Sequence, residues 1–129
     1  MLFRSADLAR QKPDAPIVVF AHRPLFDLAP KWDWATRDGA KAIEMFTPFT
    51  HLTVFYGHIH QENHFQTGSV AHHSAKSLIF PLPAPGSQEK RTPLPWDPAM
   101  PYKGLGLRLV EEEVAKASYQ VTELAVVKG

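Results

Sequence analysis

Three histidines follow two short apolar segments, at the positions where strands are expected to give way to loops. His22 follows an apolar run over residues 17–21, and His58 and His60 follow a second run over residues 52–56. Neutral imidazole is the commonest protein ligand for transition ions. In an open α/β sheet, ligands bind outside the carboxyl ends of the strands. The spacing therefore predicts that the three imidazoles converge on one edge of a sheet and bind metal there.

The elements that must position these histidines form a predicted βαβ unit over residues 17–56. Residues 17–20 are continuously apolar, as in a strand covered on both faces. A helix follows around residues 35–46, with Asp33 as its expected N-cap and Pro48 after its end. The next strand covers residues 52–56, and a right-handed crossover makes the two strands parallel. His22 and His58 then leave the same edge of the sheet.

The local sequence Gly57-His58-Ile59-His60 is suited to ligand binding. In extended backbone, residues two apart project to the same side, so His58 and His60 can serve one ion or two neighbouring ions. Gly57 lacks a Cβ atom and would let the backbone turn sharply beside a ligand.

This motif, preceded by residues 18–24 with His22-Arg23-Pro24, resembles the last two metal motifs of the calcineurin-like metallophosphoesterases over about residues 14–85. The resemblance implies that His22 and His58 share one ion and that His60 binds its neighbour. It implies an α/β fold in which a βαβ unit is followed by short strands, forming half of an αββα sandwich. The implied activity is hydrolysis of phosphomonoesters or phosphodiesters, with two Mn, Fe or Zn ions that activate water.

The upstream motifs of that family are absent from this chain. It contains no Asp-x-His, Gly-Asp or Gly-Asn-His sequence. The nearest imitation, Glu62-Asn63-His64, lacks the glycine and follows His60, so we do not expect it to be a ligand pair. A bridging carboxylate, an asparagine ligand and a general acid are therefore missing, and no catalytic residue is assigned. We expect the chain to be inactive alone, and the alternative is a residual or regulatory metal-binding module without turnover.

The length of 129 residues predicts a single domain over residues 1–129. By the resemblance this domain is the carboxyl-terminal part of an enzyme. Half of a sandwich exposes an unpaired strand edge and an apolar face, which favours association. We therefore expect an amino-terminal half, supplied as another chain, or self-association.

Charge and composition exclude several other classes of partner. Fourteen basic and thirteen acidic residues give a net charge of +1, too little for binding to nucleic-acid phosphates. No apolar run approaches the ~20 residues that cross a bilayer, so we expect a soluble chain. The absence of cysteine excludes a thiolate zinc site. The compartment is not fixed, because an export signal could lie in a missing amino-terminal region.

The remaining segments complete the predicted domain. Residues 3–11 show a short helical pattern, and short strands are expected over 62–67, 69–74 and 76–80. Seven prolines lie within 81–101, which predicts a wrapping loop over 81–103 without regular strands. Strands over 105–109 and 119–122 would form a closing hairpin, with Glu111–Glu113 in a solvated turn.

Three residues near the expected site have two interpretations each. Arg23 could offer a bidentate fork to a phosphate or form a surface salt bridge. Trp32 and Trp34 could line a substrate pocket, although large aromatic residues before a helix favour the core.

The other histidines are expected to be structural. His72 and His73 are adjacent and should point to opposite faces of a strand, so at most one of them could line a pocket. His51 precedes a strand at the opposite edge from the expected metal, and His64 lies in a polar segment.

Overall fold

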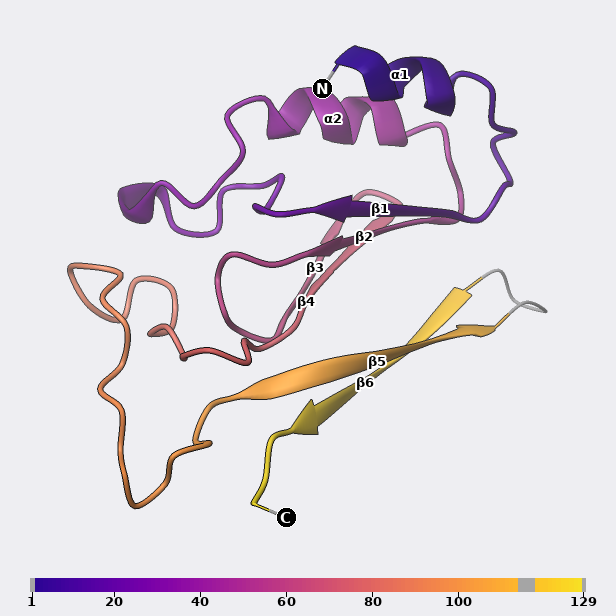
Figure 1. Cartoon of the computed structure of the whole chain (residues 1–129). Helices are drawn as coiled ribbons and strands as arrows, with labels where there is room; N and C mark the ends of the chain where they lie inside the picture. Colours follow the sequence, from indigo (N-terminus) through magenta and orange to yellow (C-terminus); the bar gives the residue numbers. More distant parts are fainter. Residues whose placement is uncertain (1, 114–117, 129) are drawn as a thin grey trace.

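The computed structural model of the chain describes residues 2–113 and 118–128. Two helices and a four-stranded sheet come first along the chain, and a two-stranded hairpin comes last (Figure 1). The elements are α1 (Leu2–Leu8), β1 (Ile17–Ala21), the 3₁₀ turn η1 (Pro30–Trp32), α2 (Gly39–Phe46), β2 (Leu52–Tyr56), β3 (Asn63–Thr67), β4 (Val70–Ser74), β5 (Gly106–Glu113) and β6 (Ser118–Ala125).

The larger sheet has the strand order β1-β2-β4-β3. Strands β1, β2 and β4 are parallel, whereas β3 runs antiparallel to β4. The predicted mixed α/β class and the parallel βαβ unit over β1, α2 and β2 are confirmed. Ile17 pairs with Leu52 and Ala21 pairs with Tyr56, so β1 and β2 end at the same edge. This register brings the residues that follow the two strands together.

Helices α1 and α2 cover one face of the larger sheet (Figure 1). Alternate residues of β2 point into this layer, and Leu52 and Val54 are buried against Ala42 and Phe46 of α2. The backbone of α2 approaches its surroundings closely at Gly39. A Cβ atom there would lie 2.0 Å from the carbonyl oxygen of Leu25, so only glycine fits.

The predicted closing hairpin is confirmed as β5 and β6, which lie on the side of the larger sheet away from the helices (Figure 1). Nη2 of Arg108 in β5 donates to the carbonyl oxygen of Ser74 at 2.7 Å. The ring of Tyr119 in β6 lies edge-on to Phe55, with 6.2 Å between centroids. The solvated turn predicted for Glu111–Glu113 is wrong, because these residues extend β5 and pair with residues 118–120.

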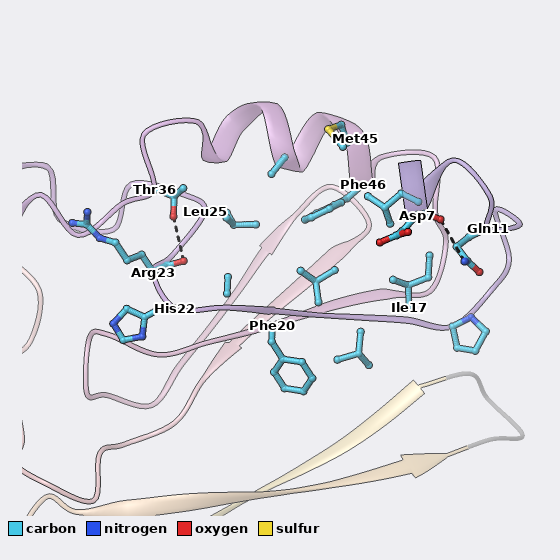
Figure 2. A pocket seen from close by; sticks show the side chains of 16 residues that line it. Asp7, Gln11, Ile17, Phe20, His22, Arg23, Leu25, Thr36, Met45 and Phe46 are labelled. Atoms are coloured by element: carbon cyan, nitrogen blue, oxygen red, sulfur yellow. Dashed lines mark hydrogen bonds between the residues drawn. The ribbon is translucent and has the colours of Figure 1, made fainter. Parts of the chain in front are cut away.

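Strand β1 differs from its prediction in one respect that matters for association. Its apolar sequence suggested cover on both faces, but β1 is an edge strand of the sheet among the described residues, and Phe20, on the face away from the helices (Figure 2), is 82% exposed. The apolar pattern indicates what the strand can bury, and the elements packed on each face decide what it does bury.

Two local predictions are also wrong. Asp33 does not cap α2 but ends η1 in a left-handed conformation, and α2 begins after Asp38. Residues 76–80 form no strand and lead directly into the predicted loop over 81–103, which contains no helix or strand. None of the helices in the described part of the chain could span a bilayer.

Candidate metal centre

His22 and His58 meet at the edge where β1 and β2 end. Nε2 of His22 lies 3.3 Å from Nδ1 of His58, and the ring centroids are 5.1 Å apart. The backbones of the two segments are also hydrogen-bonded here, because the Gly57 amide donates to the carbonyl oxygen of His22 at 3.1 Å. The structure therefore brings together the two histidines that the βαβ unit was expected to deliver to one edge. Their role as metal ligands stays a prediction.

The backbone from Gly57 to His60 is turned rather than extended, contrary to the expectation from the sequence. His58 and His60 have left-handed conformations, with φ of 68° and 55°. Non-glycine residues adopt this region uncommonly, and it is enriched at functional sites. The sharp turn therefore lies at the two histidines and not at Gly57, where a Cβ atom would have only an ordinary contact of 3.8 Å with His22.

Ile59 anchors this turn in the core. Its side chain is fully buried, and it belongs to a cluster that includes Tyr56, Trp32 and Trp34. The two tryptophans therefore have the core role that the sequence favoured. Because Ile59 is buried, its neighbours His58 and His60 are held at the surface of this cluster.

The orientation of His60 is set by a backbone carbonyl. Its Nδ1 lies 2.8 Å from the carbonyl oxygen of Phe80, and the two rings are in contact with centroids 4.6 Å apart. A carbonyl oxygen can only accept, so Nδ1 of His60 is the donor. In the neutral ring, Nε2 then carries the lone pair that a metal ion needs, and a carbonyl partner of this kind is common behind metal-binding histidines.

His58 lies in surroundings that disfavour its charged form. Burial lowers the pKa of His58, and the nearby Arg23, His22, Arg91 and His60 lower it further. Nε2 of His58 is buried, and no described residue forms a hydrogen bond with it. A buried polar atom normally has a partner. The lowered pKa favours the neutral ring, which is the form that binds metal, and the nitrogen without a partner is Nε2 rather than the Nδ1 that faces His22.

The distances fit a shared ion. Two nitrogens bound to one tetrahedral zinc ion at about 2.0–2.1 Å lie about 3.3 Å apart. This agrees with the 3.3 Å between Nε2 of His22 and Nδ1 of His58. The set of three imidazoles suits zinc, manganese or iron, but it includes no carboxylate.

A groove runs from this centre along the exposed edge of β1. It has a volume of about 870 Å³ and lies between β1 and the two helices. Figure 2 shows His22 and Arg23 at one end of the groove and Asp7 and Gln11 at the other. Arg23 forms the salt bridge that the sequence allowed, with Nη2 3.6 Å from Asp33, and its Nε donates to the carbonyl oxygen of Trp34 at 3.0 Å.

The histidines on β4 point to opposite faces, as expected. His72 is fully buried on the helix side, where its Nε2 lies 2.6 Å from Oγ1 of Thr67. His73 faces the hairpin, where its Nδ1 lies 2.7 Å from Nδ1 of His64. His51 is half-buried at the start of β2, at the opposite end of that strand from His58.

Glu62 and His64, which were not expected to be a ligand pair, lie in one cluster with a glutamate of the hairpin. Glu62 and His64 at the start of β3 meet Glu123 of β6, and one ligand atom from each lies within 4.8 Å of the others. No sequence signal could have found this group, because the hairpin must first dock on the sheet to bring Glu123 close.

Comparison with known proteins adds no relative to these observations. No protein-family model matches the chain, and no curated protein matches it. The resemblance to metallophosphoesterases therefore depends on the two histidine motifs of the sequence alone.

Proposed function

We propose that the chain is the carboxyl-terminal part of a metal-dependent phosphoester hydrolase of the calcineurin-like type. The single observation that carries this proposal is the 3.3 Å approach of Nε2 of His22 to Nδ1 of His58 at the shared edge of two parallel strands. The turned Gly57-His58-Ile59-His60 segment adds a third imidazole beside them. On this proposal the mixed α/β fold is half of an αββα sandwich.

Each histidine has a defined role in the proposed centre. His22 and His58 hold one ion between them, and His60 presents Nε2 to the neighbouring ion because Phe80 occupies its Nδ1. Two such ions, of manganese, iron or zinc, supply an activated water and polarise the phosphoryl oxygens of a phosphomonoester or phosphodiester. Arg23 lies at the same end of the groove and places a positive charge near the substrate phosphate.

The proposal includes an amino-terminal polypeptide as partner. The donor set lacks the carboxylates that a centre with two ions needs, and no strand among the described residues pairs with the outer edge of β1, the strand that precedes His22. A strand added in parallel beside β1 would end next to His22, since the carboxyl ends of parallel strands meet at one edge. Carboxylate ligands at the end of that strand would complete the centre. Self-association through the same edge is the competing outcome.

A second candidate function is a metal-binding module without turnover. It is favoured by the contacts of Arg23, whose guanidinium already binds Asp33 and the carbonyl oxygen of Trp34. An arginine engaged in this way has fewer donors left for a substrate phosphate. The absence of the upstream motifs from the sequence agrees with this alternative.

Turnover of model phosphomonoesters and phosphodiesters with added Mn²⁺ separates the two functions. The chain is assayed alone and together with an amino-terminal polypeptide that carries Asp-x-His and Gly-Asn-His motifs. We expect no turnover alone and metal-dependent turnover in the complex, which His58→Ala abolishes and His51→Ala preserves. Metal binding by the chain without turnover in any complex would support the module. Turnover by the chain alone would contradict both functions.

A further inference from the structure

Glu62, His64 and Glu123 form a cluster in which both sheets take part. Glu62 directly precedes β3, His64 lies within β3, and Glu123 lies in β6. One ligand atom from each residue lies within 4.8 Å of the others. The cluster shares no residue with the proposed centre at His22, His58 and His60. We propose that it is a second divalent-cation site, which fastens the β5–β6 hairpin to the four-stranded sheet.

The carboxylate from the hairpin is held in place by a buried arginine. Nε and Nη2 of Arg108 both contact Oε1 of Glu123, and the Arg108 side chain is only 5% exposed. Nη2 also donates to the carbonyl oxygen of Ser74 at 2.7 Å, which ties the guanidinium to the larger sheet. Glu123 is therefore positioned toward β3 before any ion binds, and such orientation by outer contacts is typical of metal ligands.

The third nitrogen of the same guanidinium, Nη1, forms no hydrogen bond with Glu123. Nη1 of Arg108 is buried, and no atom of the described residues accepts a hydrogen bond from it. A buried N–H group normally has an acceptor. Nε and Nη2 form the edge of the guanidinium that contacts Glu123, so Nη1 lies on the side away from that carboxylate. An ordered water is the usual acceptor for such a buried group.

His64 is oriented by its contact with His73. Their Nδ1 atoms lie 2.7 Å apart, so one ring donates and the other accepts. When His64 is the donor, its Nε2 carries a lone pair on the side of Glu62, whose Oε1 lies 3.4 Å away. A lone pair facing a carboxylate oxygen is repulsive, and a cation between them makes the arrangement attractive. Without a cation, the opposite tautomers allow Nε2–H of His64 to donate to Glu62. Cation binding is thus coupled to a change of tautomer in both histidines.

The donor set selects the type of ion. One imidazole nitrogen and two carboxylate oxygens suit zinc or manganese. Calcium and magnesium prefer ligands that are all oxygen, so they should bind less tightly.

The test uses a variant without the three histidines of the first centre and measures whether an ion still binds. The parent protein is the full chain with His22→Ala, His58→Ala and His60→Ala, stripped of metal with a chelator and titrated calorimetrically with Zn²⁺ and Mn²⁺. We expect one bound ion, with Zn²⁺ and Mn²⁺ both tighter than Ca²⁺. Glu62→Gln and Glu123→Gln should each weaken binding at least tenfold. Glu112→Gln, which changes another hairpin carboxylate, should leave it unchanged.

Two results of the titration would overturn the proposal. One is the absence of a bound ion in the parent protein, and the other is binding that survives both Glu62→Gln and Glu123→Gln. Glu123→Gln also breaks the contact with Arg108, and a loss of binding in this variant could come from release of the hairpin. Glu62 lies outside the hairpin, so Glu62→Gln decides whether the carboxylates themselves bind the ion. Amide exchange gives a second measure: Zn²⁺ should slow exchange in β6, and unchanged exchange would contradict a bridge. The parent protein lacks the first centre, so failure here is distinguishable from failure of the proposed hydrolase.

Discussion

Nε2 of His22 lies 3.3 Å from Nδ1 of His58, although 36 positions separate the two residues along the chain. One crossover helix, α2, lies between β1 and β2 in the chain. The two strands pair in parallel and end at the same edge, which brings the residues after them together. Two imidazole nitrogens at this distance can share an ion without any movement of the backbone. The two nitrogens of the proposed centre are therefore brought together when the βαβ unit folds.

Removal of either imidazole should lower metal affinity. We expect His22→Ala and His58→Ala each to weaken Zn²⁺ binding at the first centre by at least tenfold, because each removes one of the paired nitrogens. The measurement is calorimetric titration with Zn²⁺. Each titrated chain also carries Glu62→Gln, which disables the second proposed site. His51→Ala serves as the control, since His51 lies at the opposite end of β2. Unchanged affinity in both variants would exclude a shared ion.

Ile59 should matter for both stability and metal binding. Its side chain is fully buried beside Trp34. Truncation to alanine in Ile59→Ala should lower the free energy of unfolding by about 2–5 kcal/mol through the cavity it leaves. Ile59→Val should cost about 0.5–1.5 kcal/mol. Denaturant titration gives these values. If the buried side chain also holds His58 and His60 in their left-handed conformations, the alanine variant will bind Zn²⁺ more weakly than the valine variant.

The βαβ unit could be predicted because its signals are local. Two apolar runs of strand length predict β1 and β2. A helical spacing followed by a proline predicts α2 between them. Parallel pairing of the two strands then places His22 beside His58. The exposure of Phe20 could not be predicted, because it depends on what packs on the face of the sheet away from the helices (Figure 2). Glu123 could not be assigned to a site either, since its neighbours are set by the docking of the hairpin on the sheet.

Predictions from the sequence were also wrong where tertiary contacts outweigh local conformational preference. Glu111–Glu113 has the composition of a solvated turn, but cross-strand pairing continues β5 through it. His58 and His60 were expected in extended backbone, and the burial of Ile59 between them accompanies two left-handed residues instead. Such conformations have only a weak sequence signal in histidine, because they are stabilised mainly by surrounding structure.

Gly39 should tolerate no side chain. A Cβ atom there would lie 2.0 Å from the Leu25 carbonyl oxygen, which is backbone and cannot move aside easily. We expect Gly39→Ala to lower stability by about 1–3 kcal/mol, although alanine favours helices over glycine. Gly57→Ala is the matched control, because its Cβ would meet only His22 at 3.8 Å. Thermal unfolding compares the two, and equal midpoints would contradict the close approach of α2.

The free edge of β1 should promote association. Phe20 is 82% exposed on this strand, and an unpaired edge with apolar side chains is a template for another strand. Phe20→Lys should lower the sedimentation coefficient toward that of a monomer at concentrations where the wild-type chain associates. Val127→Lys changes an apolar residue that is 75% exposed outside the strands and should have no such effect. A wild-type chain that remains monomeric at high concentration would show that the edge does not drive association.

His72 should make the protein sensitive to acid. Burial lowers the pKa of His72 to about 4, and its Nδ1 is buried with no hydrogen-bond partner among the described residues. In the unfolded chain the pKa returns to about 6.5. Below pH 6.5 the unfolded state therefore binds more protons than the folded state, so stability falls as the pH decreases from about 6.5 to 4. Between pH 7.5 and pH 5 the loss from this one group should be about 2 kcal/mol.

Urea denaturation of the wild-type chain and of His72→Gln at these two pH values measures that loss. Glutamine keeps a polar group near Oγ1 of Thr67 but does not titrate. At pH 7.5 the variant should be less stable than the wild type, because the ring packing with Phe26 is lost. Between pH 7.5 and pH 5 its stability should fall by about 2 kcal/mol less than that of the wild type. Equal losses in the two proteins would mean that His72 takes up its proton in the folded state as readily as in the unfolded chain.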